Sequence, residues 1–138
     1  MQQELEAALQ SLPFWDHLTA GEMEEARRGA RIVRYQRGAL VHGCNGQCLG
    51  LIAVRSGKLR AYMLSEDGRE IALYRLMAGD ACVLAASCVI RQITFDVHMV
   101  ADADTELLIV NASTFKRLAQ SNVYVECCQY KLATERFS

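Results

Sequence analysis

The chain has 138 residues, which is enough for one domain with a hydrophobic core and leaves little room for two. Hydrophobic residues make up 51% of it and charged residues 22%, which is ordinary for a globular protein, and no apolar run approaches the roughly 18 residues of a membrane helix. The formal net charge of −1 argues against a domain that binds nucleic acid by itself, because such domains carry a basic face for the phosphates.

The N-terminus is polar and acidic and does not resemble a secretory signal. We therefore expect a cytoplasmic protein with no membrane partner. The basic residues that come closest to a cluster are Arg27, Arg28, Arg31 and Arg34. This group is small, so we expect any contact with DNA to lie outside this chain.

The first 29 residues predict a helical segment with two helices. Residues 2–10 have helical spacing with apolar side chains on one face, and a proline ends this helix. A small apolar cluster follows, formed by Phe14, Trp15 and Leu18. Thr19 is a good N-cap and Glu22 stands three residues later, which is the pattern of a capping box. A second helix should therefore run over residues 20–28, with Gly29 as its C-cap.

Residues 30–111 have the pattern of short strands separated by glycine. Strand-like segments cover residues 48–55, 58–64, 70–76, 93–100 and 106–110. Asp67 and Gly68 lie between two of these segments and predict a hairpin turn, because glycine takes a positive φ angle without steric cost. Many short strands with regular turns indicate a sandwich or a barrel, so we expect a mainly β fold with flanking helices.

Residues 112–138 predict two helices. The first begins at Ala112, has Asn111 or Ser113 as its N-cap, and carries Phe115, Leu118 and Ala119 on one face. The second begins near residue 122, and a coiled-coil-like seam recurs along it: Val123, Cys127, Tyr130, Thr134 and Phe137. This helix reaches the last residue without a capping residue, glycine or proline, so we expect the chain to be truncated there.

Short motifs in a fixed order resemble those of the Crp/Fnr sensor domain. They are Tyr-Gln-Arg-Gly at residues 35–38, Val-Arg-Ser-Gly-Lys-Leu-Arg at 54–60, the hairpin at 65–71, Leu-Met-Ala-Gly-Asp at 76–80, Ala-Asp-Ala-Asp-Thr-Glu-Leu at 101–107 and Phe-Lys-Arg-Leu at 115–118. The similarity extends over about residues 12–137. The chain therefore resembles the effector-sensing domain of Crp/Fnr transcription regulators.

This resemblance implies a double-stranded β-helix, or jelly roll, that holds an effector. It also implies a homodimer through the C-terminal helix, with the five seam residues in the interface, and a helix-turn-helix module that binds DNA. That module is missing from this chain. The implied division is an N-terminal helical segment at residues 1–29, a β-roll effector domain at 30–111, and C-terminal helices at 112–138 that include the start of the dimerisation helix.

The resemblance places an effector pocket around one turn and the hairpin strands, with ten residues: Gly79, Asp80, Cys82, Leu84, Ser87, Cys88, Arg91, Thr94, Tyr62 and Tyr74. Family members that bind cyclic nucleotides have a glutamate for the ribose and an Arg-Ser or Arg-Thr pair for the phosphate. Here residues 82–84 are not acidic, Ile93 precedes Thr94, and Arg91 is two positions from the expected arginine. Losing one charged hydrogen bond costs about 1.5–3 kcal/mol, so we expect no functional binding of cyclic AMP. The sequence names no other effector or cofactor.

Six cysteines are many for this length, and in a cytosolic protein we expect thiols, metal ligands or redox sensors instead of structural disulfides. Cys82 and Cys88 have apolar neighbours, which favours buried, unreactive thiols over a redox or metal sensor. Cys44 and Cys48 lie in a glycine-rich segment, and a metal or redox role stays open for them. Cys127 is expected to pack in a core, with an intersubunit disulfide as the alternative.

Three further functions are alternatives. His42 and His98 could ligate haem iron, as in gas-sensing members of the family, and His98 is expected to point into the roll. A stand-alone cyclic nucleotide-binding module is disfavoured by the missing arginine. A cupin-like metalloenzyme also uses a jelly roll but needs several histidines around one metal, and the 3 histidines show no such pattern. We therefore predict that the protein is not an enzyme and has no metal site.

Overall fold

The computed structural model describes residues 2–42, 50–82 and 98–137, and it contains the helices that the N-terminal sequence predicts. They are α1 (Gln2–Gln10), the short 3-10 helix η1 (Trp15–His17) and α2 (Ala20–Arg28). The predicted capping box is present. The Glu22 N–H donates to Thr19 Oγ1 at 3.2 Å, and the Thr19 N–H donates to Glu22 Oε1 at 2.9 Å. These two bonds satisfy N–H groups at the start of α2 and fix where it begins.

Gly29 follows α2 as its C-cap, as predicted, and its N–H donates to the Glu25 carbonyl at 3.1 Å. Its φ angle is −101°, so the backbone is not left-handed. A Cβ atom at this position would lie 1.9 Å from Oγ1 of Thr114. The glycine is therefore required by the close approach of another helix, and the left-handed cap that the sequence favours is absent.

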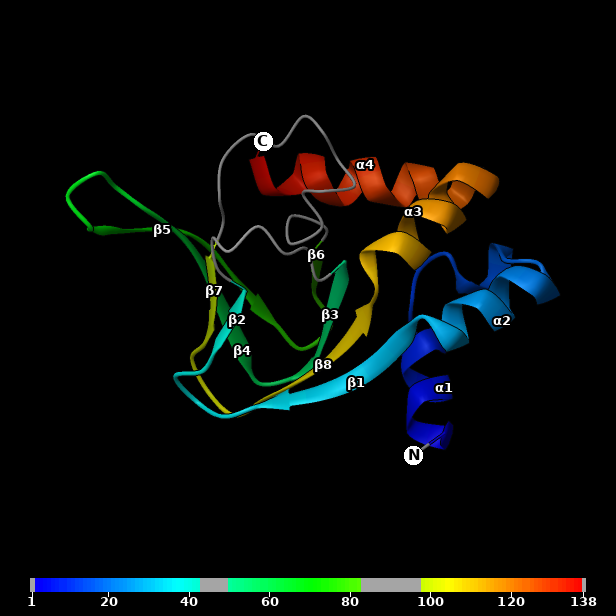
Figure 1. Ribbon diagram of the computed structural model, residues 1–138, viewed down its shortest axis with the longest axis horizontal. Coiled ribbons are helices and arrows are strands. Elements are labelled where there is room, and N and C mark those ends of the chain that lie inside the picture. Colours follow the sequence, from blue (N-terminus) through cyan, green and yellow to red (C-terminus); the bar gives the residue numbers. More distant parts are fainter. Residues whose placement is uncertain (1, 43–49, 83–97, 138) are drawn as a thin grey trace.

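The strands form, among the described residues, two four-stranded antiparallel sheets (Figure 1). They are β1 (Ala30–Tyr35), β2 (Leu40–His42), β3 (Leu51–Ser56), β4 (Lys58–Leu64), β5 (Glu70–Met77), β6 (Ala81–Cys82), β7 (His98–Ala101) and β8 (Thr105–Val110). The first sheet has the order β1-β8-β3-β6 and the second the order β2-β7-β4-β5. The chain passes repeatedly from one sheet to the other, and this confirms the predicted jelly roll with flanking helices.

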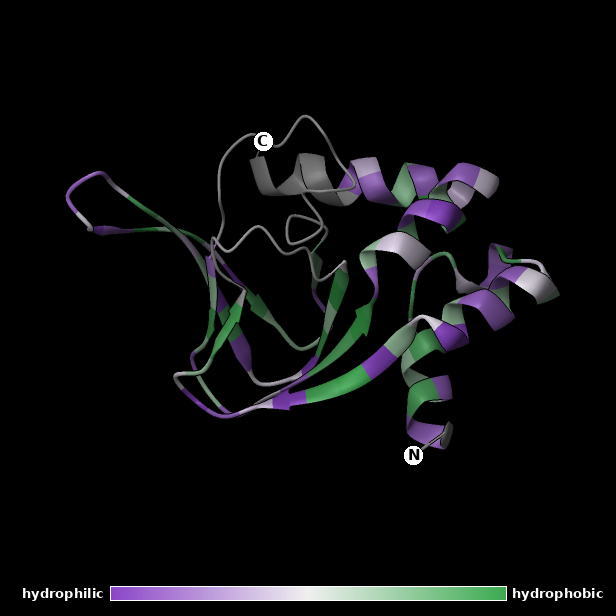
Figure 2. Ribbon diagram, viewed as in Figure 1, coloured by the Kyte–Doolittle hydropathy of each residue, from purple (hydrophilic) through white to green (hydrophobic). Residues whose placement is uncertain are grey.

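The first sheet is covered on both faces, and β8 lies in its interior between β1 and β3. Side chains alternate along β8, so that Leu108 and Val110 face the helices while Leu107 and Ile109 face the second sheet. Figure 2 shows hydrophobic residues along this strand. Strand β8 therefore contributes to two separate hydrophobic clusters.

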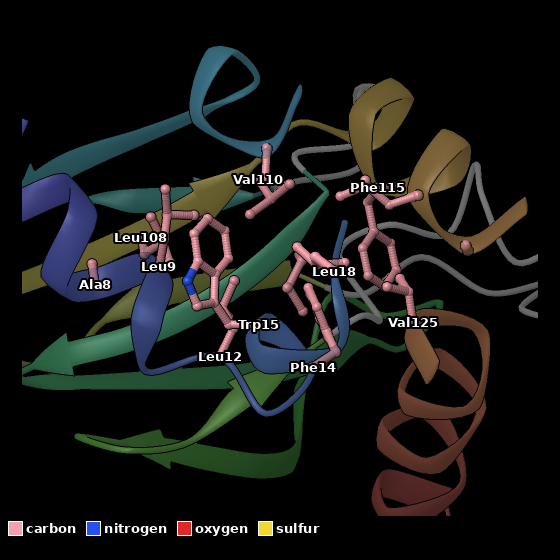
Figure 3. Close-up of a cluster of buried hydrophobic side chains, with 14 residues drawn as sticks. Ala8, Leu9, Leu12, Phe14, Trp15, Leu18, Leu108, Val110, Phe115 and Val125 are labelled. Atoms are coloured by element: carbon pink, nitrogen blue, oxygen red, sulfur yellow. The ribbon is translucent and has the colours of Figure 1, made fainter. Parts of the chain in front are cut away.

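The helix-side cluster lies between the first sheet and the helices (Figure 3), and it contains the apolar residues predicted after the first helix. Its buried members are Ala8, Leu9, Leu12, Phe14, Trp15, Leu18, Ala26, Leu51, Leu108, Val110, Phe115, Leu118, Ala119 and Val125. The roll-interior cluster lies between the two sheets. Its buried members are Val41, Ile52, Val54, Leu59, Ala61, Leu76, Cys82, Met99, Ala101, Leu107 and Ile109.

The hairpin of β4 and β5 projects from the second sheet, away from α1 and α2 (Figure 1). Its turn is closed by a 2.8 Å hydrogen bond from the Ser65 N–H to the Arg69 carbonyl. The Gly68 N–H donates to the Ser65 carbonyl, and Gly68 has a φ angle of +82°. The predicted Asp67-Gly68 turn is confirmed, and the positive φ angle explains the glycine.

Helices α3 (Ala112–Ser121) and α4 (Val123–Phe137) end the described chain. Phe115, Leu118 and Ala119 are buried on one face of α3, as predicted. Asn111 occupies the N-cap position, but its side chain makes no capping bond and instead accepts from the guanidinium of Arg31. The capping role predicted for that side chain is therefore wrong. In the part of the chain that is described, no helix is long and apolar enough to cross a membrane.

Candidate functional site

The two hairpin tyrosines predicted in the pocket lie on opposite faces of the second sheet. Ala61 of β4 belongs to the roll-interior cluster, so the adjacent Tyr62 points to the outer face. Tyr74 of β5 pairs with Ala61 and packs against the roll-interior cluster. The register then shifts, because Tyr62 pairs with Ala72 and leaves Leu73 as a β-bulge. Of these two tyrosines, only Tyr74 therefore packs against the roll-interior cluster.

Inside the roll, Tyr74 meets Cys82. The Tyr74 hydroxyl oxygen and the Cys82 Sγ atom are 3.1 Å apart, and Cys82 is fully buried at the end of the short strand β6. The prediction of a buried thiol at this position is confirmed. A hydroxyl and a thiol can each donate or accept a hydrogen bond without carrying charge. In apolar surroundings, this pair suits a ligand that is largely uncharged.

Gly79 and Asp80 form the turn that leads into β6. The Gly79 N–H donates to the Val54 carbonyl at 3.0 Å, and the Val54 N–H donates to the Asp80 carbonyl at 2.9 Å. The Asp80 carboxylate accepts from the Met77 N–H at 2.9 Å, and Gly79 has a φ angle of +95°. Both residues therefore shape the turn, and the Asp80 carboxylate is occupied by the backbone.

A second polar group lies on the outer face of the second sheet. The rings of Tyr62 and His98 are stacked with centroids 5.2 Å apart, and the Arg60 guanidinium lies 5.6 Å from the Tyr62 centroid. Arg60 also donates to Asp102 at 3.2 Å. His98 is buried, but its neighbour Met99 belongs to the roll-interior cluster, so His98 faces the opposite side. The expectation that His98 points into the roll is wrong.

Several predicted residues lie outside the described part of the chain: Leu84, Ser87, Cys88, Arg91, Thr94, Cys44, Cys48 and the side chain of His42. The structure therefore brings together Tyr74 and Cys82, with Gly79 and Asp80 in the adjoining turn. Among the described residues, no group of three or more histidine, cysteine, aspartate or glutamate side chains could hold a metal ion.

Helix α4 has one buried and one exposed side. Val125 is fully buried, and Cys128 is partly buried against the helix-side cluster. On the other side, the predicted seam residues Val123, Cys127 and Tyr130 are exposed; Val123 is 63% exposed and Tyr130 is 53% exposed. The expected core packing of Cys127 is therefore wrong within this chain. The side chains of the remaining seam residues, Thr134 and Phe137, lie outside the described part.

Gln129 of α4 was not predicted from the sequence as a site residue. Its side chain is buried, with 7% exposure, and it forms no hydrogen bond with the described residues. Helix α4 contacts β6, the strand that carries Cys82. A buried amide without a hydrogen-bond partner is rare in proteins. The signal in the sequence is its position one turn after Val125, on the side of the helix that faces the domain.

Three of the four arginines of the predicted basic group are paired with carboxylates. Arg27 forms two 2.8 Å hydrogen bonds to Glu6, and Arg34 forms one of 2.9 Å to Glu106. The Arg27 guanidinium lowers the pKa of Glu6, and Glu6 in turn raises the pKa of Arg27. The other two arginines contact an acid or an amide: Arg28 pairs with Glu24, and Arg31 bonds Asn111. Three of the four arginines are therefore paired with carboxylates, which reduces the positive charge that this group offers to a phosphate backbone.

Residues 32–122 match the family model of the cyclic nucleotide-binding domain. A search of curated proteins gives no match. Among solved structures, the chain is similar to a protein of Eubacterium rectale that is assigned to the Crp/Fnr family of transcriptional regulators. The two share 36% sequence identity with a TM-score of 0.88, over 93% of this chain and 59% of the other. This chain thus spans less than two thirds of that protein.

Two more distant structures share the fold. The sensor domain of the transcriptional regulator DNR from Pseudomonas aeruginosa has 20% identity and a TM-score of 0.75, over 97% of this chain and 89% of that domain. The regulatory domain of Toxoplasma gondii PKA, crystallised with cAMP, has 20% identity and a TM-score of 0.72, over 97% of this chain and 50% of the other. At this identity, the likeness concerns the fold alone.

Proposed function

This chain belongs to the cyclic nucleotide-binding domain family, and we propose that it is the effector-sensing domain of a transcription regulator of the Crp/Fnr type. The observation that carries the proposal is the 36% identity with the E. rectale protein over 93% of this chain. The module is regulatory, like the proteins it resembles, and is not an enzyme. The DNA-binding part belongs to the length of such regulators that this chain does not span.

The exposed side of α4 supports a homodimer as the working form. Val123, Tyr124 and Tyr130 place apolar surface on one side of the helix, while Val125 packs it onto the domain from the other. A helix with apolar residues on both sides is suited to pack against two partners at once. We propose that the second partner is α4 of another copy, with Val123, Cys127, Tyr130, Thr134 and Phe137 in the interface.

We further propose that the effector is not cyclic AMP. Ile93 stands where the arginine for the cyclic phosphate is expected, and no acidic residue follows the turn at residues 82–84. In the described part of the roll interior, the buried residues are uncharged. The shared fold with a cAMP-bound kinase domain does not decide the ligand, because the fold does not supply the phosphate-binding side chains.

The proposed effector site combines the residues found together in the roll with those predicted after them. Tyr74 and Cys82 are its described polar groups, and the Gly79–Asp80 turn leads the chain into it. The predicted remainder is Leu84, Ser87, Cys88, Arg91 and Thr94. These groups fit a small molecule with little charge and one or two polar atoms.

Calorimetry with cyclic AMP tests the effector proposal. We expect no measurable heat of binding, and a micromolar affinity would contradict the proposal. The matched variant is Ile93→Arg, which restores the missing guanidinium next to Thr94. Because a charged hydrogen bond contributes about 1.5–3 kcal/mol, this variant should bind cyclic AMP roughly ten- to a hundredfold more tightly than the parent chain.

The regulator proposal is tested with the product of the complete gene, using the 138-residue chain as the control. The complete product should bind duplex DNA from its own promoter, with an affinity that falls steeply as salt increases, because phosphate contacts release counterions. The shorter chain should not bind. A complete product that fails to bind any promoter DNA would contradict the proposal.

A redox, metal or haem sensor remains an alternative to the small-molecule effector, and an absorption spectrum distinguishes them. A haem or iron–sulfur sensor would show visible absorption after anaerobic purification. The buried position of Cys82 among apolar side chains favours an unreactive thiol there. We therefore expect a colourless protein. Visible absorption would contradict the small-molecule proposal and favour a sensor with a bound haem or iron–sulfur group.

A further inference from the structure

The first turn of α3 carries backbone donors that the protein itself does not use. The Phe115 N–H donates to the Asn111 carbonyl at 2.9 Å, which is the first bond of the helix. The Asn111 side chain could cap the helix but is bonded to Arg31 instead. Among the described residues, the N–H groups of Ser113 and Thr114 therefore have no acceptor. These donors add to the positive end of the helix dipole.

The hydroxyl of Thr114 is a third unused group at the same place. Thr114 is buried, with 3% exposure, and its hydroxyl forms no hydrogen bond with the part of the chain that is described. The Oγ1 atom faces Gly29 at the end of α2, since a Cβ atom at position 29 would lie 1.9 Å from it. A buried hydroxyl without a hydrogen-bond partner is rare in proteins, so we expect a partner from outside the chain.

A surface hollow between α2 and α3 joins these groups. Its volume is about 660 Å³, and its lining includes Ser113 and Thr114 of α3 and Gly29 at the end of α2. Small-molecule pockets have volumes of about 300–1,000 Å³, so this hollow can hold a ligand of that kind. The hollow lies on the helix side of the first sheet, and none of its lining residues belongs to the roll-interior cluster.

Arginine side chains supply positive charge around the hollow. Arg28 and Arg117 are part of the lining, and Arg31 bonds an amide that is also part of it. Glu24 and Glu25 line the hollow as well, but each is paired with one of these arginines: Arg28 lies 3.6 Å from Glu24, and Arg117 contacts Glu25. The two ion pairs cancel, so Arg31 and the helix dipole leave the hollow with a net positive charge.

We propose that the start of α3 is a binding site for a phosphate group, either inorganic phosphate or the phosphate of a small metabolite. The phosphate oxygens accept from the N–H groups of Ser113 and Thr114 and from the Thr114 hydroxyl, with Arg28 and Arg117 beside them. Helix N-termini bind such anions because unpaired N–H groups and the helix dipole act together. The site is separate from the proposed effector site in the roll.

The test is a calorimetric titration of the 138-residue chain with inorganic phosphate, compared with potassium chloride at the same ionic strength. We expect saturable binding of phosphate and a higher melting temperature in its presence, because a ligand that binds only the folded state stabilises it. Glycerol 3-phosphate is the second probe. If it binds more tightly than inorganic phosphate, the site accepts a phosphorylated small molecule, and if it binds more weakly, the site accepts the free ion.

Variants of Thr114 test the buried hydroxyl. Thr114→Val removes the hydroxyl and keeps the size of the side chain. Because the hydroxyl has no partner within the described chain, this change should leave the unliganded protein at least as stable as the parent. Phosphate binding should become about tenfold weaker or more, since one hydrogen bond to a charged group is lost. Thr114→Ser keeps the hydroxyl and should bind phosphate nearly as tightly as the parent.

A matched pair of arginine variants tests the charge. Arg117→Gln removes a guanidinium from the hollow and leaves Glu25 unpaired, so phosphate binding should weaken by about tenfold or more. Arg69→Gln removes the same charge from the hairpin turn, where the arginine side chain is 85% exposed, and should leave the affinity unchanged.

Two results would overturn the proposal: no saturable phosphate binding by the parent chain, or equal affinities of the parent and Thr114→Val, which means that the anion binds elsewhere. Should Thr114→Val fail to fold, the arginine pair decides the question. An equal loss of affinity in Arg117→Gln and Arg69→Gln would then show that phosphate senses only the overall charge. The titration involves neither the effector nor DNA, so a failure here leaves the proposed function intact.

Discussion

The two hydrophobic clusters on either side of the first sheet are built from different side chains. The helix-side cluster contains three large rings, those of Phe14, Trp15 and Phe115, and the Phe14 and Phe115 centroids are 6.4 Å apart. The roll-interior cluster is built mainly from aliphatic side chains, and it includes the Tyr74–Cys82 contact. The helices are thus attached through a few large contacts, whereas the roll is held by many small ones and carries the polar groups of the proposed site.

The largest expected effect comes from removing a ring on the helix side. Phe115 is fully buried, so Phe115→Ala should lower the free energy of unfolding by about 3–5 kcal/mol, measured by urea denaturation. The control is Leu64→Ala at the projecting hairpin, where the side chain is 48% exposed and the change should stay within about 0.5 kcal/mol. Similar losses in the two variants would contradict the comparison.

A clash at the edge of the same cluster should have the next largest effect. Gly29→Ala places a Cβ atom 1.9 Å from Oγ1 of Thr114 and should cost about 1–3 kcal/mol in unfolding free energy, because α2 and α3 must separate. Gly21→Ala, inside α2, meets no atom within 4 Å and should instead stabilise the protein by up to about 1 kcal/mol. If Gly29→Ala and Gly21→Ala changed the unfolding free energy by the same amount, the contact with Thr114 would not explain the glycine at position 29.

On the roll side, a single polar deletion should have a smaller effect. Tyr74→Phe removes the hydroxyl that contacts Cys82 and should lower the free energy of unfolding by about 0.5–1.5 kcal/mol. Tyr35→Phe is the matched control, since Tyr35 packs against the same cluster and its hydroxyl has no hydrogen bond among the described residues. A loss at Tyr35 as large as at Tyr74 would show that the contact with Cys82 contributes nothing specific.

The smallest effect is expected at the surface of the helical side, where Glu6 pairs with Arg27. The guanidinium lowers the pKa of Glu6, so the pair stabilises the protein at neutral pH and this contribution is lost as pH falls through the lowered pKa. Glu6→Gln should therefore unfold at a lower temperature than the parent at neutral pH. The difference should vanish well below the ordinary glutamate pKa of about 4.3. A difference that persists in acid would point to packing instead of charge.

The local signals in the sequence predicted most of the fold. The Thr19–Glu22 capping box and the Asp67-Gly68 turn depend on residues that are close in the chain, so their spacing alone specifies them. The order of the strand motifs then led to the jelly roll. The same local reasoning identified Cys82 as a buried thiol, because the residues beside it are apolar.

Features that depend on contacts between distant segments were predicted less well. The faces of Tyr62 and Tyr74 are set by the register of two strands and a bulge at Leu73, which the nearly continuous apolar run of β5 does not reveal. Gln129 is buried because of how α4 lies on the domain, and the requirement for glycine at position 29 comes from Thr114. Each of these depends on how segments that are distant in sequence pack against one another.

The position of β8 has a consequence for how the protein is made. Its neighbour β1 pairs with it from Ala30 opposite Val110 to Tyr35 opposite Thr105. On the ribosome, β1 and β3 are therefore synthesised long before the strand that joins them. The first sheet cannot close until the chain through Val110 has emerged, and such non-local pairing is slow to form. During this interval, β1 and β3 have open edges towards the missing strand, and unpaired strand edges are prone to non-native pairing.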